Sequence, residues 1–209
     1  MKILIIGATR GIGARLSEQA LKNGHEVTVL ARHPQKLTVP DDKVTVIRGD
    51  IRDGAIMRQA VEGQEAVALT IGVKPALGKV SVFSEGTRNV LEAMKRASVN
   101  KLVCVTGIGA GDSKGHGGFA YDKVVLPLVL KSIYEDKNRQ EALIKESDLQ
   151  WVIVRPGFLT NGPLTGRYRA ITDLQGVKAG KISRADVAHF ILGQLDKMTF
   201  LHETPLLSY

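Results

Sequence analysis

With 209 residues, 44% of them hydrophobic and 24% charged, the chain has the length and composition of one soluble globular domain. No apolar run approaches the roughly 20 residues that a membrane helix needs, and the start does not resemble a secretory signal, so we expect a cytoplasmic protein without a membrane partner. The net charge of +8 is spread along a chain with only 5% aromatic residues, which argues against nucleic-acid binding and favours an anionic cofactor or substrate.

The chain alternates between short apolar runs and segments with helical periodicity. β-Branched apolar runs predict strands at residues 2–6, 26–32, 43–49, 65–72, 101–106 and 150–156. Helical spacing of apolar residues predicts helices at residues 12–22, 53–63, 81–98 and 135–147. This alternation predicts an α/β fold: a single doubly wound Rossmann-type domain over residues 1–209, with a mostly parallel sheet in the order 3-2-1-4-5-6 and helices on both faces. A small substrate-side portion is expected at about residues 156–209.

The segment GATRGIG joins the first predicted strand to the first predicted helix. Gly7 permits a sharp exit from the strand, Gly11 lets the backbone approach a pyrophosphate, and Gly13 lets the helix pack closely on the strand. The N–H groups and dipole of the helix start then face an anion. We therefore expect this turn to bind the pyrophosphate of a nicotinamide dinucleotide. Its other expected cofactor contacts are Thr9, Arg10 and Ile12.

The residue that ends the second strand indicates which dinucleotide fits. An acidic residue there would hold the ribose hydroxyls of NAD, whereas this chain has Arg32, followed by His33 and Lys36. Cations suit the 2′-phosphate of NADP, and Arg10 in the glycine turn adds another. We therefore expect NADP(H) to be preferred over NAD(H).

Further segments complete a pattern that resembles a known family. Besides GATRGIG and EVTVLAR (26–32), the chain carries GDI (49–51), SEGTRNVLEAMK (84–95), IKESDLQWVIVRPG (144–157), PLTGRYR (163–169) and ISRADVAHFIL (182–192). This ordered set covers nearly the whole chain and resembles the short-chain dehydrogenase/reductase superfamily. The resemblance is specifically to its small atypical branch of NAD(P)H-binding proteins, which includes biliverdin-IXβ reductase/flavin reductase and NmrA-like proteins.

The resemblance implies roles for residues that follow the later strands. Asp50 would accept a hydrogen bond from the adenine amino group, and Ile51 would pack on the adenine ring. From position alone, Asp50 could instead cap the helix that begins near Asp53, or belong to a turn. The remaining implied contacts, along the ribose and nicotinamide, are Ile71, Gly72, Thr106, Pro156, Gly157 and Phe158.

The chain departs from the family in the residues for chemistry. Many members use a Ser and a Tyr with a Lys four residues later, and this Lys lowers the pKa of the Tyr, which acts as general acid. Here Tyr121 is followed by a lysine after two residues and Tyr134 after three, and Thr106 stands where the serine would. The catalytic candidates that remain are Thr106 and Lys137; the resemblance places Lys137 on a helix face toward the cofactor, with a plain surface lysine as the alternative.

The missing tyrosine pattern directs the functional hypotheses. Biliverdin/flavin reductases also lack it and deliver hydride to a conjugated acceptor whose proton can come from solvent. The resemblance therefore implies an NADPH-dependent reductase of a flavin, a tetrapyrrole or another conjugated small molecule. We expect the chain to act as a monomer or homodimer. The alternatives are a non-catalytic NADP(H)-binding sensor of the NmrA-like type and a sugar-nucleotide epimerase or dehydratase, although such enzymes carry a larger carboxyl-terminal domain. A planar acceptor would fit an apolar pocket, for which the candidate lining is Phe119, Tyr121, Phe158 and Leu164.

The remaining features concern mobility, burial and other chemistries. The glycine-rich stretch 107–118 is typical of a mobile loop that covers a ligand, or of a plain surface loop. The one cysteine, Cys104, lies in the apolar run KLVCVT and is expected in the core. The five histidines show no ligand spacing and no GxSxG motif occurs, so we expect neither a metal site nor a serine nucleophile.

Overall fold

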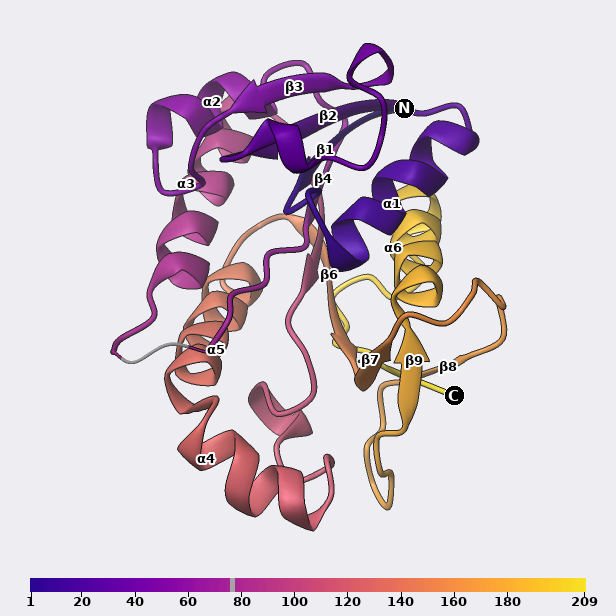
Figure 1. Cartoon of the computed structure of the whole chain (residues 1–209). Coiled ribbons are helices and arrows are strands. Elements are labelled where there is room, and N and C mark those ends of the chain that lie inside the picture. Colours follow the sequence, from indigo (N-terminus) through magenta and orange to yellow (C-terminus); the bar gives the residue numbers. More distant parts are fainter. Residues whose placement is uncertain (76–77) are drawn as a thin grey trace.

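A computed structural model describes residues 1–75 and 78–209. Within them, an eight-stranded sheet has the order β3-β2-β1-β4-β5-β6-β10-β8. Its first six members are parallel to their neighbours: β1 (Lys2–Ile6), β2 (Glu26–Ala31), β3 (Thr45–Arg48), β4 (Ala66–Leu69), β5 (Lys101–Val105) and β6 (Gln150–Pro156). The predicted Rossmann-type fold and its strand order are thus confirmed (Figure 1).

Helices cover both faces of the sheet (Figure 1). On one face lie α1 (Gly11–Lys22) and α6 (Arg184–Lys197). On the other lie α2 (Gly54–Val61), α3 (Val82–Ala97) and α5 (Lys131–Lys145). Alternation along β1 explains how one strand serves two cores, because successive side chains of a strand point to opposite faces. Ile3 and Ile5 join the α1/α6 core, whereas Leu4 and Ile6 join the α2/α3 core.

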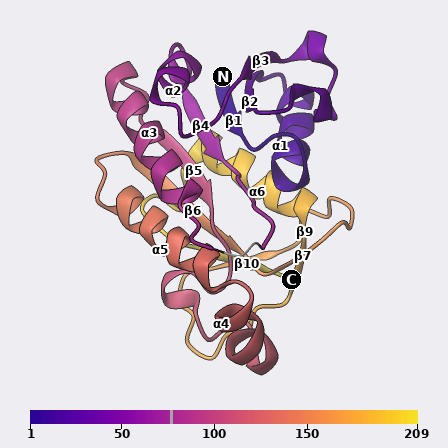
Figure 2. The same ribbon diagram turned by 60° about the vertical axis from the view of Figure 1, so that its left-hand side comes forward.

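The carboxyl-terminal half adds elements that the sequence periodicity did not predict. β10 (Leu206–Ser208) extends the sheet parallel to β6, and β8 (Arg169–Ile171) closes it antiparallel to β10. β7 (Phe158–Thr160) and β9 (Lys181–Ser183) form a separate parallel pair. A π-helical turn, η4 (Tyr121–Val125), and the short α4 (Leu126–Leu128) lead into α5, which begins four residues earlier than predicted. Figure 2 shows α4 and the β7/β9 pair beyond the carboxyl edge of the sheet.

Three short 3₁₀ turns complete the regular structure of the described residues. They are η1 (Pro34–Lys36), η2 (Asp41–Lys43) and η3 (Gly111–Ser113). η1 follows β2 directly and therefore sets the position of Lys36 relative to the end of that strand.

Polar side chains fix the starts of the helices that border the carboxyl edge. The Asp53 side chain accepts hydrogen bonds from the Ala55 and Ile56 N–H groups and so caps α2. The start of α3 is held by a residue of another helix, because buried Asp136 of α5 accepts from the Phe83 N–H. Each cap satisfies helix N–H groups that would otherwise be unpaired. These contacts therefore fix where α2 and α3 begin beside the carboxyl edge of the sheet.

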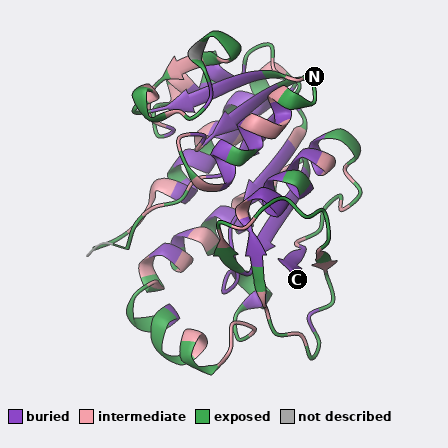
Figure 3. Cartoon of the chain, turned by 45° about the vertical axis from the view of Figure 1, so that its right-hand side comes forward, coloured by how far each residue is buried: buried purple, intermediate pink, exposed green. Residues whose placement is uncertain are grey.

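Burial follows the layers, with the strands enclosed between the helices (Figure 3). Cys104 is fully buried in β5, as predicted. Large exposed apolar side chains of the described residues gather near η4 and α4: Phe119, Val124, Val125, Leu128 and Val129. No helix within residues 1–75 and 78–209 combines the length and apolar character required to cross a bilayer.

Candidate functional site

A cavity of about 1280 Å³ opens along the carboxyl edge of the parallel strands. Each of the six parallel strands contributes residues from its end to the lining, because carboxyl ends of parallel strands meet at one edge. The lining residues directly after these strands include Gly7, Arg32, Gly49, Thr70, Thr106 and Gly157. The volume exceeds the roughly 300 to 1,000 Å³ of typical ligand pockets, so a large ligand, or two adjacent ones, can be accommodated.

The glycine turn forms the floor of this cavity. Gly7 has φ +99°, and a Cβ at that position would lie 2.7 Å from the Thr70 carbonyl oxygen. A Cβ at Gly13 would collide with the Gly7 carbonyl oxygen, so Gly13 packs the helix onto the strand beneath the cavity lining. Gly11 has φ +65°, where a side chain would be strained. The turn therefore requires glycine at each of the three positions, and Thr70 is the packing partner that the sequence did not reveal.

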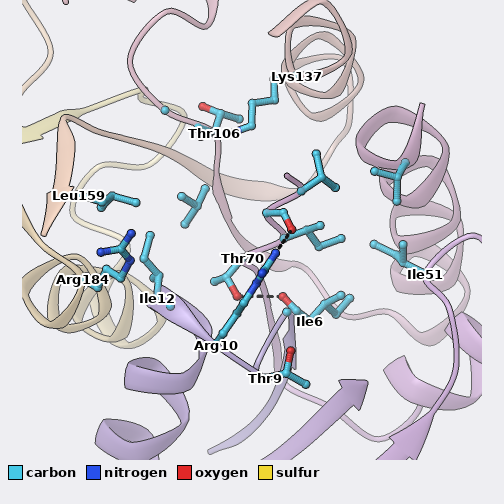
Figure 4. A pocket seen from close by; sticks show the side chains of 18 of the residues that line it. Ile6, Thr9, Arg10, Ile12, Ile51, Thr70, Thr106, Lys137, Leu159 and Arg184 are labelled. Carbon is cyan, nitrogen blue, oxygen red and sulfur yellow. Dashed lines mark hydrogen bonds between the residues drawn. The ribbon is translucent and has the colours of Figure 1, made fainter. Parts of the chain in front are cut away.

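The start of α1 at this floor suits an anion. The helix begins at Gly11, and its N-cap residue, Arg10, makes no side-chain capping hydrogen bond. Among the residues that the structure describes, no side chain accepts from the first helical N–H groups at the cavity. The helix dipole adds partial positive charge at this end. Arg10 instead donates across the cavity to the Gly72 carbonyl oxygen at 3.3 Å, and Figure 4 shows its side chain extended there.

The end of the cavity beside β2 and β3 carries a cluster of cations around one carboxylate. Arg52, which the sequence analysis did not single out, donates to Asp50 twice, from Nε to Oδ1 and from Nη2 to Oδ2, each at 3.0 Å. Arg32 lies near the same carboxylate, with 3.8 Å between its Nη1 and Asp50 Oδ2. The Arg52 hydrogen bond, with both arginine charges, lowers the pKa of the Asp50 carboxyl group. His33 and Lys36 also line this end.

Asp50 therefore belongs to a turn and an ion pair, since the Arg52 N–H also donates to its Oδ1 at 3.0 Å. It does not cap α2, because that role falls to Asp53. Of the two positional alternatives for Asp50, the structure thus shows the turn. Contact of Asp50 with an adenine amino group stays a prediction, as does packing of Ile51, which also lines the cavity.

The opposite end of the cavity is built around Thr106. Its hydroxyl donates to Glu141 Oε1 at 2.7 Å, so it is committed to a buried carboxylate. Its carbonyl oxygen accepts a hydrogen bond from Lys137 Nζ. Burial lowers the pKa of Lys137 to about 8. The structure thus brings both catalytic candidates to one end of the cavity, with Thr106 positioned through its hydroxyl and Lys137 through its ammonium.

A buried ion pair lies behind the Thr106 end of the cavity. Arg155 of β6 is fully buried and donates to Glu141 of α5, from Nε to Oε1 at 3.0 Å and from Nη2 to Oε2 at 2.6 Å. Arg155 also donates to Asp112, in the segment after β5. One guanidinium therefore joins β6, α5 and that segment, and it fixes the carboxylate that holds Thr106.

Two tyrosines from different elements meet at the same end. The hydroxyl groups of Tyr121 (η4) and Tyr134 (α5) lie 3.0 Å apart, and Tyr121 can also donate to the Ile108 carbonyl oxygen at 3.0 Å. Burial raises the pKa of each. The Tyr121 ring packs edge-on against Phe158, with centroids 5.3 Å apart. Tyr121 and Phe158 thus give the cavity an aromatic wall, whereas Phe119 and Leu164, also expected there, lie outside the lining.

The glycine-rich stretch after β5 has two different halves. Ile108, Ala110 and Ser113 are buried, and the Ser113 hydroxyl donates to the Ala110 carbonyl oxygen at 2.6 Å. The first half of this stretch is therefore packed into the fold and tied to β6 through the Arg155 contact. Mobility of residues 107–118, and closure of the loop from Gly107 to Tyr121 over a ligand, stay predictions.

The structure brings the predicted cofactor contacts together. With the exception of Gly13, they all line the one cavity: Gly7, Thr9, Arg10, Gly11, Ile12, Arg32, Asp50, Ile51, Ile71, Gly72, Thr106, Pro156, Gly157 and Phe158. Polar lining residues that the sequence analysis did not propose as contacts are Arg52, Thr70, Tyr134, Asn161 and Arg184. A doubly wound sheet with an anion site on a glycine turn defines the class of dinucleotide-binding Rossmann proteins.

Comparison with known proteins agrees with this class. The chain belongs to the NAD(P)H-binding family, whose model matches residues 7–198. A Bacillus subtilis protein named as an uncharacterized sugar epimerase, YhfK, is 27% identical over 94% of this chain and 89% of its own length. An uncharacterized chloroplastic protein of Arabidopsis thaliana is 30% identical over 90% of this chain and 69% of its own.

Solved structures share the fold over the full chain. ChuY of Escherichia coli O157:H7, described as an anaerobilin reductase, superposes with a TM-score of 0.83 at 25% identity, covering 100% of this chain and 97% of that one. A short-chain dehydrogenase/reductase of Veillonella parvula in complex with NADP superposes with a TM-score of 0.81 at 20% identity, covering 100% and 94%. The resemblance to atypical short-chain dehydrogenases/reductases is thus confirmed, and an oxidoreductase-type NAD(P)H-binding fold is established.

Proposed function

We propose that this protein is an NADPH-dependent reductase of a planar, conjugated small molecule such as a flavin or tetrapyrrole. The observation that carries the proposal is the continuity of one cavity from a cationic end, at Arg32 and Lys36, to an aromatic end, at Tyr121 and Phe158. A dinucleotide extended along the strand ends would place its 2′-phosphate at the first and leave room for an acceptor at the second.

The residues present fit a dinucleotide. The uncapped start of α1 offers N–H groups to a pyrophosphate, and the cavity has no bulky side chain at Gly7 or Gly11. Arg32 is 65% exposed and held only loosely by Asp50, so it is available to a 2′-phosphate. These features support NADP(H) as the preferred cofactor, with the base beside Asp50 and Ile51 and the nicotinamide toward Thr106 and Pro156.

The chemistry follows from what the far end provides. Bound NADPH would supply a hydride to an electron-poor carbon of the acceptor. The tyrosine pair does not resemble an activated general acid, because burial raises both pKa values where the Tyr–Lys mechanism needs a lowered one. Lys137 is directed to the Thr106 carbonyl oxygen and, with Glu141, positions the strand end. The proton is therefore assigned to solvent, and the protein contributes orientation and an apolar wall.

The comparisons support this choice of reaction. ChuY, described as an anaerobilin reductase, shares the fold at 25% identity, and a tetrapyrrole is a planar conjugated acceptor. The NADP complex of the Veillonella parvula protein supports the cofactor through the shared fold.

A second candidate is a sugar-nucleotide epimerase, which the name of the Bacillus subtilis relative favours. A non-catalytic NADP(H)-binding sensor of the NmrA-like type is the third. The absence of the Tyr–Lys spacing in the sequence argues against epimerisation by the usual tyrosine base.

The experiment that tests the proposal combines binding with turnover. Purified protein is titrated with NADPH, and NADPH oxidation is then followed at saturating cofactor with flavins, biliverdin and quinones, beside a parallel assay for epimerisation of nucleotide sugars. Oxidation that depends on one of the conjugated acceptors supports the reductase. Tight cofactor binding without turnover of any acceptor supports the sensor, and epimerisation supports the second candidate; either result overturns the proposal.

A further inference from the structure

We propose that Arg184 of α6 is a ligand of the cofactor pyrophosphate. The glycine turn near the amino terminus forms one part of the anion site, and Arg184, from the carboxyl-terminal third of the chain, would complete it. This inference rests on the dinucleotide assignment proposed above, and concerns a residue outside the glycine turn and outside the ribose end. If the inference holds, Arg184 contributes equally to the binding affinity of NADPH and of NADH.

The position of the side chain carries the inference. Arg184 and Gly11 line the same cavity, and a Cβ placed on Gly11 would lie 3.9 Å from both Cδ and Nε of Arg184. The guanidinium stem therefore lies over the residue at which α1 begins. Figure 4 shows Arg184 beside Ile12 and Leu159, on the side of the cavity away from Ile51. It is thus placed at the start of α1 and far from the adenine end.

The local structure holds α6 in this register. Ser183 caps the helix by accepting from the Asp186 N–H, and buried Asp186 accepts in turn from the Ser183 hydroxyl. The Gln19 side chain of α1 donates to the Ala185 carbonyl oxygen at 2.9 Å, which ties the start of α6 to the neighbouring helix. Arg184 is the first helical residue between these contacts, so its Cα is fixed relative to the glycine turn.

The charge of Arg184 is unmatched where it stands. It donates from Nη1 to Asn161 Oδ1 at 2.9 Å, and this neutral amide orients the guanidinium without neutralising it. Within the described residues, no carboxylate oxygen lies within 4.0 Å of it, in contrast to Arg32. A cation at the first position of a helix also faces the positive end of the helix dipole. The acidic residue of that turn, Asp186, is engaged by Ser183 and Thr165 instead, so the Arg184 guanidinium is better stabilised with an anion bound. A diphosphate at the start of α1 supplies that anion.

The shared pyrophosphate gives the inference a distinctive signature. NADPH and NADH carry the same pyrophosphate and differ in the 2′-phosphate alone. Loss of Arg184 should therefore weaken both cofactors alike, by about tenfold to a hundredfold, as expected for one charge-assisted hydrogen bond. Loss of Arg32 should weaken NADPH selectively. ADP-ribose retains the pyrophosphate and lacks nicotinamide, so its affinity should also fall when Arg184 is replaced.

The test measures dissociation constants of NADPH, NADH and ADP-ribose by calorimetry for the wild type and for Arg184→Gln, Arg184→Lys and Arg32→Ala. Arg88→Ala is the control, because Arg88 is an exposed arginine of α3 outside the cavity lining. Circular dichroism melting checks the fold of each variant. Parallel losses for all three ligands in Arg184→Gln, with partial recovery in Arg184→Lys, support the proposal.

Three results would overturn it. Unchanged affinities together with a raised KM for an anionic acceptor would assign Arg184 to the acceptor instead. A loss confined to NADPH would place it at the 2′-phosphate, and unchanged affinities and KM would make it a surface charge. The supporting measurements are all dissociation constants, so an absence of reductase turnover would not contradict this inference. If the wild type binds none of the three ligands, the dinucleotide assignment itself fails.

Discussion

Arg32 and Asp50 follow neighbouring strands of the sheet, and the Arg32 Nη1 atom lies 3.8 Å from the Asp50 Oδ2 atom at the cationic end of the cavity. The carboxylate is already held at 3.0 Å by Arg52, which leaves Arg32 weakly engaged. A weakly engaged, exposed guanidinium can turn to a second anion at small cost, because exposed ion pairs contribute about 0 to 1 kcal/mol. This relationship gives the first prediction its basis.

Replacing Arg32 with Ala should weaken NADPH by roughly tenfold to a hundredfold and leave NADH nearly unchanged. The reason is that one charge-assisted hydrogen bond contributes about 1.5 to 3 kcal/mol and NADH has no 2′-phosphate. Titration of both cofactors at low and high salt measures the effect, and the wild-type preference for NADPH should shrink as salt rises. Equal wild-type affinities, or parallel losses for both cofactors, would show that Arg32 is a surface charge.

Replacing Arg155 with Met should destabilise the protein by roughly 3 to 5 kcal/mol, because the buried Glu141 carboxylate loses the guanidinium that donates to it twice and keeps Lys145 at 4.0 Å as a weaker cationic neighbour. The double variant Arg155→Met/Glu141→Gln should recover part of the loss. Urea unfolding measures the free energy of unfolding. Arg96→Met is the matched control, since Arg96 forms an exposed pair with Glu92 and should change stability by about 0 to 1 kcal/mol. Similar costs for the buried and the exposed pair would contradict the prediction.

The sequence predicts the secondary structure of the amino-terminal part of the chain better than that of the carboxyl-terminal part. From the first strand to β6, apolar periodicity and the glycine turn are local signals, so the strand order and the cluster at Gly7, Gly11 and Arg32 could be predicted. The start of α5 at Lys131 was missed because Pro127 and an apolar run precede it and obscure the helical period. The carboxyl-terminal strands are three residues long, too short for a period of two to be visible.

Residues that reach the cavity from distant elements could not be predicted for a different reason. Arg184 stands in the motif ISRADVAHFIL, but only the packing of α6 on α1 brings it to Gly11. The link from Arg155 through Glu141 to Thr106 joins three elements, and no spacing along the chain encodes it. Tyr121 and Tyr134 lack the familiar separation from a lysine, yet the turn at η4 brings their hydroxyl groups together.

The lowered pKa of Lys137 should appear in the pH dependence of stability. Burial lowers its pKa to about 8 in the folded protein, whereas the pKa of a lysine in an unfolded chain is about 10.4. Between these values the unfolded chain binds more protons than the native one, so this group makes stability rise with pH. The difference in free energy of unfolding between wild type and Lys137→Met should therefore shift in favour of the wild type from pH 8 to pH 10. A difference that does not vary with pH would contradict the assignment.

Replacing Tyr121 or Tyr134 with Phe should lower kcat only modestly, because the proposed reaction takes its proton from solvent. Each change removes the hydrogen bond that the two hydroxyl groups share, and Tyr121→Phe also removes the contact with the Ile108 carbonyl oxygen. Steady-state oxidation of NADPH with the best acceptor, together with the cofactor dissociation constant, measures this. General acids contribute about 10² to 10⁴-fold. A thousandfold fall in kcat with cofactor binding intact would identify that tyrosine as the proton donor.

The packing of α6 on α1 has a consequence for how the chain folds. The Gln19 to Ala185 hydrogen bond joins residues near the two extremes of the sequence, and Ile3 and Ile5 share a core with Val187 and Ile191. During synthesis on the ribosome, the first βαβ unit emerges long before the helix that covers one of its faces. Contacts of such separation form slowly, because a long loop must close before they are gained. Ile3 and Ile5 can therefore be fully covered only after α6 has been synthesised.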